Sequence, residues 1–237
     1  MKVVALVGDA GDSCVRMAAR LGVCTAVAIA PDSQAVSLAL GRAKSSGAAR
    51  LVHLWDSSLL LELEREREVL GGELAKAALL AALGRRLEAR LFVVPESTHG
   101  WLGPALAEEL DLPHLSSVIS IERVSESGEK SDVPPGLLVR RRCLHGVQRL
   151  RGPAAGVLCV LPSPNAPRPS SSSTNDIERW DLARLGLGAA DLPRPLLRPV
   201  MPERRSELPG RTFDSLSALV ERLRQDGLAL VPDGGGD

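Results

Sequence analysis

Residues 90–113 constrain the fold of this chain more than any other segment. A short apolar run at residues 91–94 ends at Pro95, a polar loop follows, and an amphipathic stretch at residues 105–110 begins after Gly103-Pro104. This order predicts a strand, a loop and the start of a helix. The N-terminus of a helix and the free backbone N–H groups beside it bind anions. We therefore expect a nucleotide phosphate site at this junction.

Strand and helix patterns alternate over the first 115 residues. Apolar runs at residues 3–7, 25–30, 50–55 and 91–94 are typical of strands buried on both faces. Helix patterns lie between them at residues 13–21, 34–44 and 73–87, and Ser33 is placed to cap the second helix. Strands that alternate with helices form parallel sheets, so the predicted fold class is α/β, a three-layer Rossmann-like domain with a parallel sheet.

The pattern changes after residue 115. Residues 118–124 and 137–142 alternate apolar and polar side chains, and the segment between them is rich in Ser, Glu, Gly and Pro. This predicts a β-hairpin extension of the sheet. Residues 157–161 predict another buried strand, and residues 162–174 form a loop rich in Pro and Ser.

The C-terminal part predicts an extended arm that ends in a helix. Prolines recur between residues 191 and 209, and residues 213–225 place apolar side chains at helical spacing. We predict an α/β domain over residues 1–190, an arm and helix that contact a partner subunit over residues 191–230, and a disordered tail over residues 231–237. The pattern alone leaves open whether the helix folds back on its own sheet or reaches a partner.

The composition excludes several classes of function. Lys+Arg and Asp+Glu are both 29 and aromatic residues make up 2%, which gives no reason to expect nucleic acid as a partner. No apolar run is long enough to insert into a membrane. The four cysteines form no CxxC pair, so we expect buried thiols in the cytoplasm rather than a disulfide framework or a metal site. We expect no catalytic residues, because no nucleophile and base stand in a recognisable arrangement.

Several short motifs occur in an order that resembles the β subunit of electron transfer flavoprotein. The chain resembles a divergent member of that family, with matches over most of its length that are weaker before Gly72. The matching stretches are Gly103-Pro104 through Leu112-Pro113, Ser120-Ile121-Glu122, the basic stretch 138–143, Asn165-Ala166-Pro167-Arg168, Leu185-Gly186-Leu187, Pro202-Glu203-Arg204-Arg205 and residues 219–227.

The resemblance implies a role in electron transport without bond chemistry of the chain's own. It implies a heterodimer with an α subunit that holds FAD. The heterodimer would pass electrons from dehydrogenases to a downstream acceptor. It also implies a nucleotide pocket for AMP, or for a second FAD in some members. Carried over by position, the cofactor-binding residues are Val7, Gly8, Asp9, Ala30, Pro31, Pro95, Glu96, Ser97, His99, Gly100, Trp101, Leu102 and Gly103.

The chain departs from the family pattern at two places. The loop at residues 96–99 is short, and Trp101-Leu102 stands where the family has Gln-Thr, so Trp101 either stacks on an adenine or fills its slot. Residues 169–174 lack the leucine with which family members dock acyl-CoA dehydrogenases. Two alternatives stay open beside the electron-transfer role: a stand-alone adenine-nucleotide sensor, and a degenerate structural paralogue without nucleotide.

A few single residues have both a functional and a structural interpretation. His53 is expected to be a satisfied histidine in the core or at a sheet end, and His114 has no partner that the sequence indicates. Arg140-Arg141-Arg142 either pairs with the acidic face of a partner or is an ordinary exposed segment.

Overall fold

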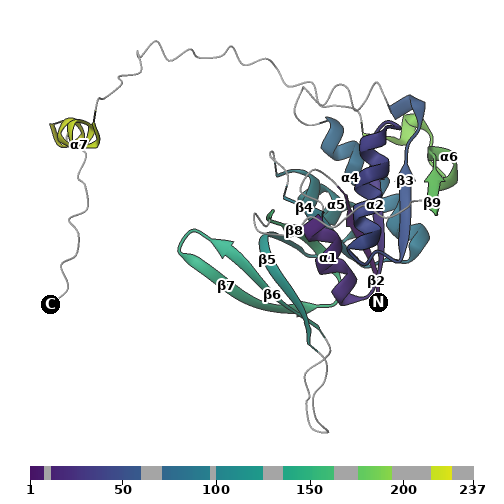
Figure 1. Ribbon diagram of the computed structural model, residues 1–237, viewed down its shortest axis with the longest axis horizontal. Coiled ribbons are helices and arrows are strands. Elements are labelled where there is room, and N and C mark those ends of the chain that lie inside the picture. Colours follow the sequence, from purple (N-terminus) through teal and green to yellow (C-terminus); the bar gives the residue numbers. More distant parts are fainter. Residues whose placement is uncertain are drawn as a thin grey trace, which may run out of the picture. The chain divides into compact units, whose positions relative to one another are not determined.

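The computed structural model describes residues 1–7, 12–59, 71–96, 100–124, 136–162, 176–193 and 215–225. The chain divides into two compact units, Met1–Leu196 and Leu197–Asp237 (Figure 1). Each unit is described by itself below.

The first unit is built on a sheet in which nine described strands follow the order β7-β6-β5-β8-β4-β1-β2-β3-β9. Neighbours from β5 to β9 in this order pair in parallel, whereas β6 pairs antiparallel with both β5 and β7. The strands are β1 (Lys2–Leu6), β2 (Val23–Ile29), β3 (Arg50–Leu54), β4 (Leu91–Pro95), β5 (His114–Val124), β6 (Gly136–Cys143), β7 (Gly146–Pro153), β8 (Gly156–Val160) and β9 (Ile177–Trp180).

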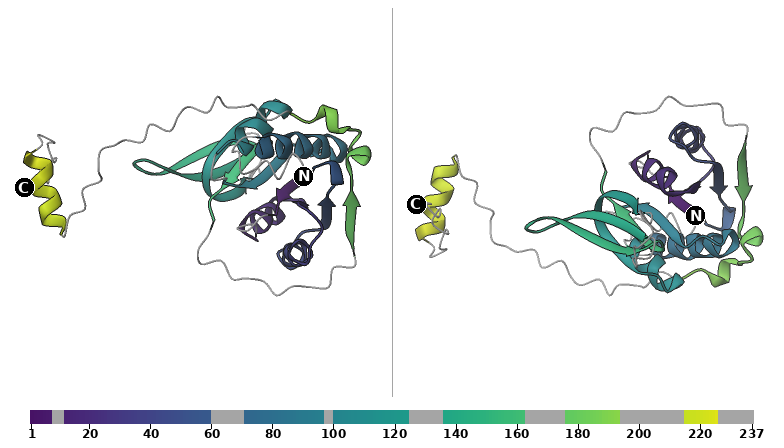
Figure 2. Two further views of the ribbon diagram at one scale, coloured as in Figure 1. Left: turned by 90° about the horizontal axis from the view of Figure 1, so that it is seen from above. Right: turned by 90° about the horizontal axis from the view of Figure 1, so that it is seen from below.

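Helices cover both faces of the sheet, which confirms the predicted three-layer α/β fold (Figure 2). One hydrophobic core includes residues of α1 and α2, and a second core includes residues of α4, α5 and α6. The helices are α1 (Asp12–Leu21), α2 (Gln34–Ser45), α4 (Gly71–Leu87), α5 (Leu102–Leu110) and α6 (Leu182–Leu185), with short 3-10 turns η1 (Ser57–Leu59) and η3 (Ala189–Asp191).

The alternation of side chains along β1 explains why there are two cores. Val3 and Ala5 point into the core that contains α1, and Val4 and Leu6 point into the core that contains α4. A strand that is buried on both faces is apolar at nearly every position, which is the pattern seen at residues 3–7 of the sequence.

The predicted helices are confirmed, with one corrected boundary. Ser33 caps α2, because its side chain accepts a hydrogen bond from the backbone N–H of Val36 over 3.3 Å. Helix α5 begins at Leu102 and not after Gly103-Pro104 as predicted. Pro104 lies in the first helical turn, where the missing N–H costs nothing.

The predicted hairpin extension is confirmed and is longer than expected. β5, β6 and β7 form an antiparallel ribbon, and neither β7 nor the strand at Ile177–Trp180 was predicted from the sequence pattern. Most residues of β7 are exposed, so no apolar face marks the strand. The predicted turn of the first hairpin, the Pro/Ser loop beyond residue 162 and the tail at residues 231–237 lie outside the described residues.

The second unit contains α7 (Leu216–Gln225), which confirms the predicted final helix. Its first turn is capped, because the Ser215 hydroxyl accepts a hydrogen bond from the backbone N–H of Ala218 over 3.2 Å. Within the described part of the chain, no helix combines the length and the hydropathy that crossing a membrane requires.

Candidate functional site at the carboxyl edge of the sheet

The strand order creates a topological switch point beside β1. The chain passes from β1 outward to β2 and β3, and then places β4 on the other side of β1. Ligands of α/β proteins bind outside the carboxyl ends of the strands at such a point. Ala5 pairs with Val93, so the segments that follow β1 and β4 leave the sheet side by side.

This edge contains most of the predicted nucleotide-binding residues that the structure describes. Val7 follows β1 and is 9% exposed, while Pro95 ends β4 and Glu96 follows it. Gly100 precedes α5 with a φ of 73°, a conformation that favours glycine. Of the predicted residues, Gly8, Asp9, Ser97 and His99 lie outside the described part of the chain.

Neighbouring groups of the protein already engage part of this edge. The N–H of Val7 donates to the carbonyl of Val27 over 2.7 Å. The carbonyl of Ala30 lies 2.9 Å from Nε2 of His53, which is 4% exposed, and Pro31 is exposed. His53 is therefore a satisfied histidine at a sheet end, which confirms the structural interpretation.

The N-terminus of α5 is held by a carboxylate of the same chain. Oε2 of Glu73 accepts hydrogen bonds from the backbone N–H of Trp101 over 2.9 Å and from that of Leu102 over 3.0 Å. Trp101 is the N-cap of α5, its side chain makes no cap hydrogen bond, and the residue is 46% exposed. The sequence did not single out Glu73. A glutamate in the first turn of one helix does not indicate which other helix its side chain contacts.

A second carboxylate lies at the end of β4. Oε2 of Glu96 accepts a hydrogen bond from the backbone N–H of Ser117 over 2.7 Å. Ser117 has a φ of 57° and lies where the pairing of β5 with β8 shifts register. The carboxylate thus supports the bulge in β5 through a backbone donor.

The fit of a nucleotide phosphate can be tested at these donors. The resemblance implies that the phosphate meets loop N–H groups and the N-terminus of α5. Here a carboxylate oxygen, which is chemically close to a phosphate oxygen, occupies two of those N–H groups. The residues at the start of α5 therefore do not fit a bound phosphate.

Gly103 serves packing rather than ligand approach. A Cβ at this position would lie 2.2 Å from Sγ of Cys159 and 2.6 Å from Nε2 of His114. Those two side chains occupy the space that the glycine leaves, and Nε2 of His114 lies 3.4 Å from Sγ of Cys159. The partner of His114, which the sequence did not indicate, is thus a cysteine 45 residues away.

The His114–Cys159 pair is not an activated nucleophile and base. Burial, with smaller contributions from Glu96 and Glu73, raises the pKa of the Cys159 thiol to about 12. Burial also lowers the pKa of His114. Both groups are neutral near pH 7, whereas a reactive cysteine needs a depressed pKa.

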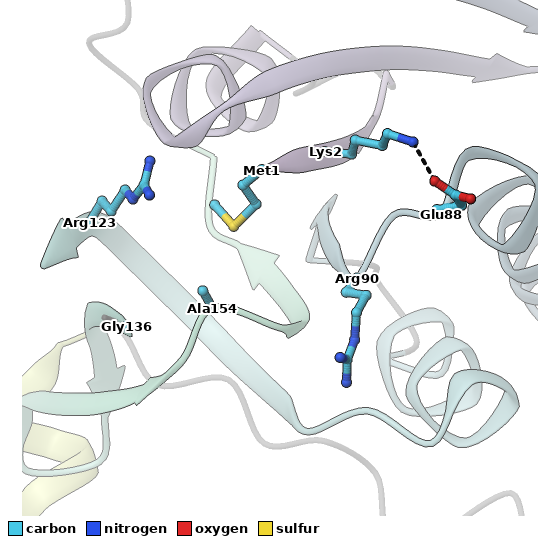
Figure 3. Close-up of a pocket in the computed structure, with 7 residues that line it drawn as sticks. All are labelled: Met1, Lys2, Glu88, Arg90, Arg123, Gly136 and Ala154. Carbon is cyan, nitrogen blue, oxygen red and sulfur yellow. Dashed lines mark hydrogen bonds and ion pairs between the residues drawn. The ribbon is translucent and has the colours of Figure 1, made fainter. Parts of the chain in front are cut away.

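A separate pocket lies at the opposite edge of the sheet, where β1 and β4 begin (Figure 3). It has a volume of about 310 Å³, and Lys2 in it forms an ion pair with Glu88 over 2.7 Å. The other residues that line it are Met1, Arg90, Arg123, Gly136 and Ala154. None of the predicted nucleotide-binding residues lines this pocket.

In the described ranges, no group of three or more His, Cys, Asp or Glu residues is placed to hold a metal ion.

A parallel sheet with helices on both faces and a switch point at its carboxyl edge defines a Rossmann-like α/β protein. The family model of the electron transfer flavoprotein domain matches residues 12–185, from α1 to α6. The chain therefore belongs to the electron transfer flavoprotein domain family, whose role is in electron transport. A comparison with curated proteins found no match.

Proposed function

We propose that this chain is a β subunit-like component of an electron transfer flavoprotein. It pairs with an α-like subunit that holds or shares FAD, and the pair passes electrons from a dehydrogenase to a downstream acceptor in the cytoplasm. The observation that carries this proposal is the family match across residues 12–185, which spans most of the sheet and its helices. The chain acts as a carrier component and not as an enzyme, in keeping with its neutral His114–Cys159 pair.

The C-terminal unit supports the pairing with a partner subunit. Helix α7 belongs to the unit Leu197–Asp237, which lies beyond the residues matched to the family domain. Apolar residues recur at positions 216, 219, 220 and 223, the spacing of one helical stripe. We propose that the arm and helix at residues 191–230 contact the α-like subunit.

The β6–β7 hairpin supports a protein partner with an acidic face. Arg140 is paired in register with Arg149, so both side chains lie on one face of the hairpin. Arg142 and Arg151, each two residues away along its strand, lie on the same face, which we call the arginine face. All four residues are exposed, and residues 136–153 contain no Asp or Glu. Arginine without lysine, beside the exposed Leu144 at the tip, is typical of protein interfaces.

The carboxyl edge of the sheet is the proposed position of any nucleotide that the chain itself contacts. Val7, Ala30, Pro31 and Pro95 would lie against an adenine ring, with the predicted loop residues around it. AMP is the ligand that the resemblance implies, and its phosphate would have to displace Glu73 from α5.

Co-expression with the α-like subunit encoded nearest to its gene tests the pairing. We expect the two chains to co-purify as a yellow heterodimer with the visible absorbance of a flavin. A colourless, monodisperse monomer that does not bind the α-like subunit would contradict the proposal. Titration calorimetry of the chain alone with AMP and ATP tests the alternative, since a stand-alone sensor binds nucleotide without a partner.

A further inference from the structure

We infer that Glu73 takes the place of a nucleotide phosphate at the N-terminus of α5, so that the chain binds no AMP there. The two hydrogen bonds to Trp101 and Leu102 carry this inference, because they join a carboxylate of α4 to the donors that a phosphate would need. The inference rests on the proposed function only for the identity of AMP as the implied ligand.

Few donors remain at this helix end. A helix leaves its first N–H groups without a partner inside the helix, and in α5 the first internal hydrogen bond runs from Ala105 to Trp101. The preceding donors are therefore those of Trp101, Leu102 and Gly103, since Pro104 has no N–H. Glu73 accepts from two of these three.

The position of Glu73 makes its carboxylate a favourable occupant. It lies in the first turn of α4, and its oxygen reaches the first turn of α5. The positive ends of both helix dipoles therefore act on one negative charge. An external phosphate would have to compete with an anion that is tethered to the protein and already in position.

The surroundings add two further obstacles to a phosphate. Glu96 places a second carboxylate at the same edge, and both Glu96 and Glu73 act on Cys159, which indicates a negative local field. The close approach that a glycine gives a ligand is absent at Gly103, because Cys159 and His114 fill the space beside it.

The experiment uses the full chain without a partner, so that a failure to form the heterodimer does not affect it. The purified wild-type chain is denatured with acid, and the released small molecules are identified by mass spectrometry. We expect no stoichiometric AMP. One AMP per chain, or tight binding of added AMP by the wild-type chain, would overturn the inference.

A second measurement compares the melting temperature of wild type and Glu73→Ala with and without inorganic phosphate. Glu73→Ala is expected to melt at a lower temperature, and phosphate is expected to restore part of this loss because the vacated N–H groups of Trp101 and Leu102 donate to it. Wild type is expected to respond much less. Equal responses of the two proteins to phosphate would contradict the inference.

Two variants complete the design. Glu108→Ala removes an exposed carboxylate from the same helix α5, and it is expected to show no greater phosphate response than wild type. Glu73→Gln keeps an acceptor oxygen without the charge, so it is expected to lose less stability than Glu73→Ala. If Glu73→Ala does not fold, the AMP content of wild type still decides the question.

Discussion

Arg50 of β3 and Glu178 of β9 form a bidentate ion pair that joins the two strands, although they are 128 positions apart in the sequence. Nη2 of Arg50 donates to Oε2 of Glu178 over 2.7 Å, and its Nε donates to Oε1. Nε1 of Trp180 donates to the same carboxylate over 3.1 Å. The guanidinium groups of Arg50 and Arg184 lie 5.4 Å and 4.3 Å from the centre of the Trp180 ring. This cluster closes the edge of the sheet.

The cluster makes stability depend on pH. The hydrogen bond from Arg50 is the largest cause that lowers the pKa of Glu178 from 4.5 to about 2. A carboxyl whose pKa is lower in the folded state stabilises the protein above its unfolded pKa, and this stabilisation is lost as the pH falls from about 5 to about 2. Glu178→Gln is expected to cost about 1 kcal/mol at pH 7, since the pair is partly exposed.

Urea unfolding of wild type and Glu178→Gln at pH 7 and pH 3 checks this prediction. The difference between the two proteins is expected to shrink at pH 3, where most of the Glu178 carboxylate is protonated in the unfolded chain. Glu88→Gln, which removes the exposed partner of Lys2, is the matched control and is expected to have a smaller effect. A difference that is the same at both pH values would exclude the assigned role of the Glu178 charge.

The central strands and helices could be predicted from sequence because each carries its own periodicity. β1, β2, β3 and β4 are mostly apolar, and Ser33 marks the start of α2 locally. β7 could not be predicted because its side chains are exposed on both faces and show no alternation.

The predicted site illustrates the same limit. The sequence located the carboxyl edge, since the strand–loop–helix order at residues 90–113 is local. The contact from Glu73 to Trp101 joins two helix starts across 28 residues, and the contact from His114 to Cys159 spans 45 residues. Both depend on how α4, α5 and β8 pack, and side-chain type alone does not encode that packing.

Gly103→Ala is expected to destabilise the protein by about 2 kcal/mol, because overpacking forces side chains or backbone to move. The added Cβ would lie 2.2 Å from Sγ of Cys159, far inside van der Waals contact. Combining the change with Cys159→Ala is expected to recover part of the loss, since it removes the atom in closest contact. Thermal or urea unfolding measures both effects.

Gly152→Ala is the matched control for this glycine. A Cβ at Gly152 would meet nothing within 4 Å, so we expect a change within about 0.5 kcal/mol. Equal losses at Gly103 and Gly152 would show that the packing of α5 on Cys159 does not set the cost.

The four cysteines are expected to fall into two classes of reactivity. Cys14, Cys24 and Cys159 are buried, and burial raises the pKa of each thiol to about 12. Cys143 is exposed, which corrects the expectation that all the thiols are buried. Iodoacetamide is therefore expected to label one thiol quickly and the other three only on unfolding. Cys143→Ser should abolish the fast phase, and a fast phase that survives this change would contradict the assignment.

The arginine face provides the last prediction. Like charges directly opposite on neighbouring strands repel each other, and Arg140 and Arg149 are such a pair. Replacing both by glutamate is expected to weaken binding of the α-like subunit by about tenfold or more and to reduce the salt dependence of that binding. Binding measured by surface plasmon resonance at several salt concentrations checks both effects.

A stability measurement separates this role from a structural one. Arg149→Gln relieves the repulsion with Arg140, so the free chain is expected to keep or slightly gain stability while its binding weakens. A loss of binding that follows only a loss of folding would argue against a docking role. Arg90→Glu reverses an exposed charge outside the hairpin and is expected to leave binding unchanged. If Arg90→Glu weakens binding as much as the double reversal does, the attraction comes from the total charge of the chain and not from the arginine face.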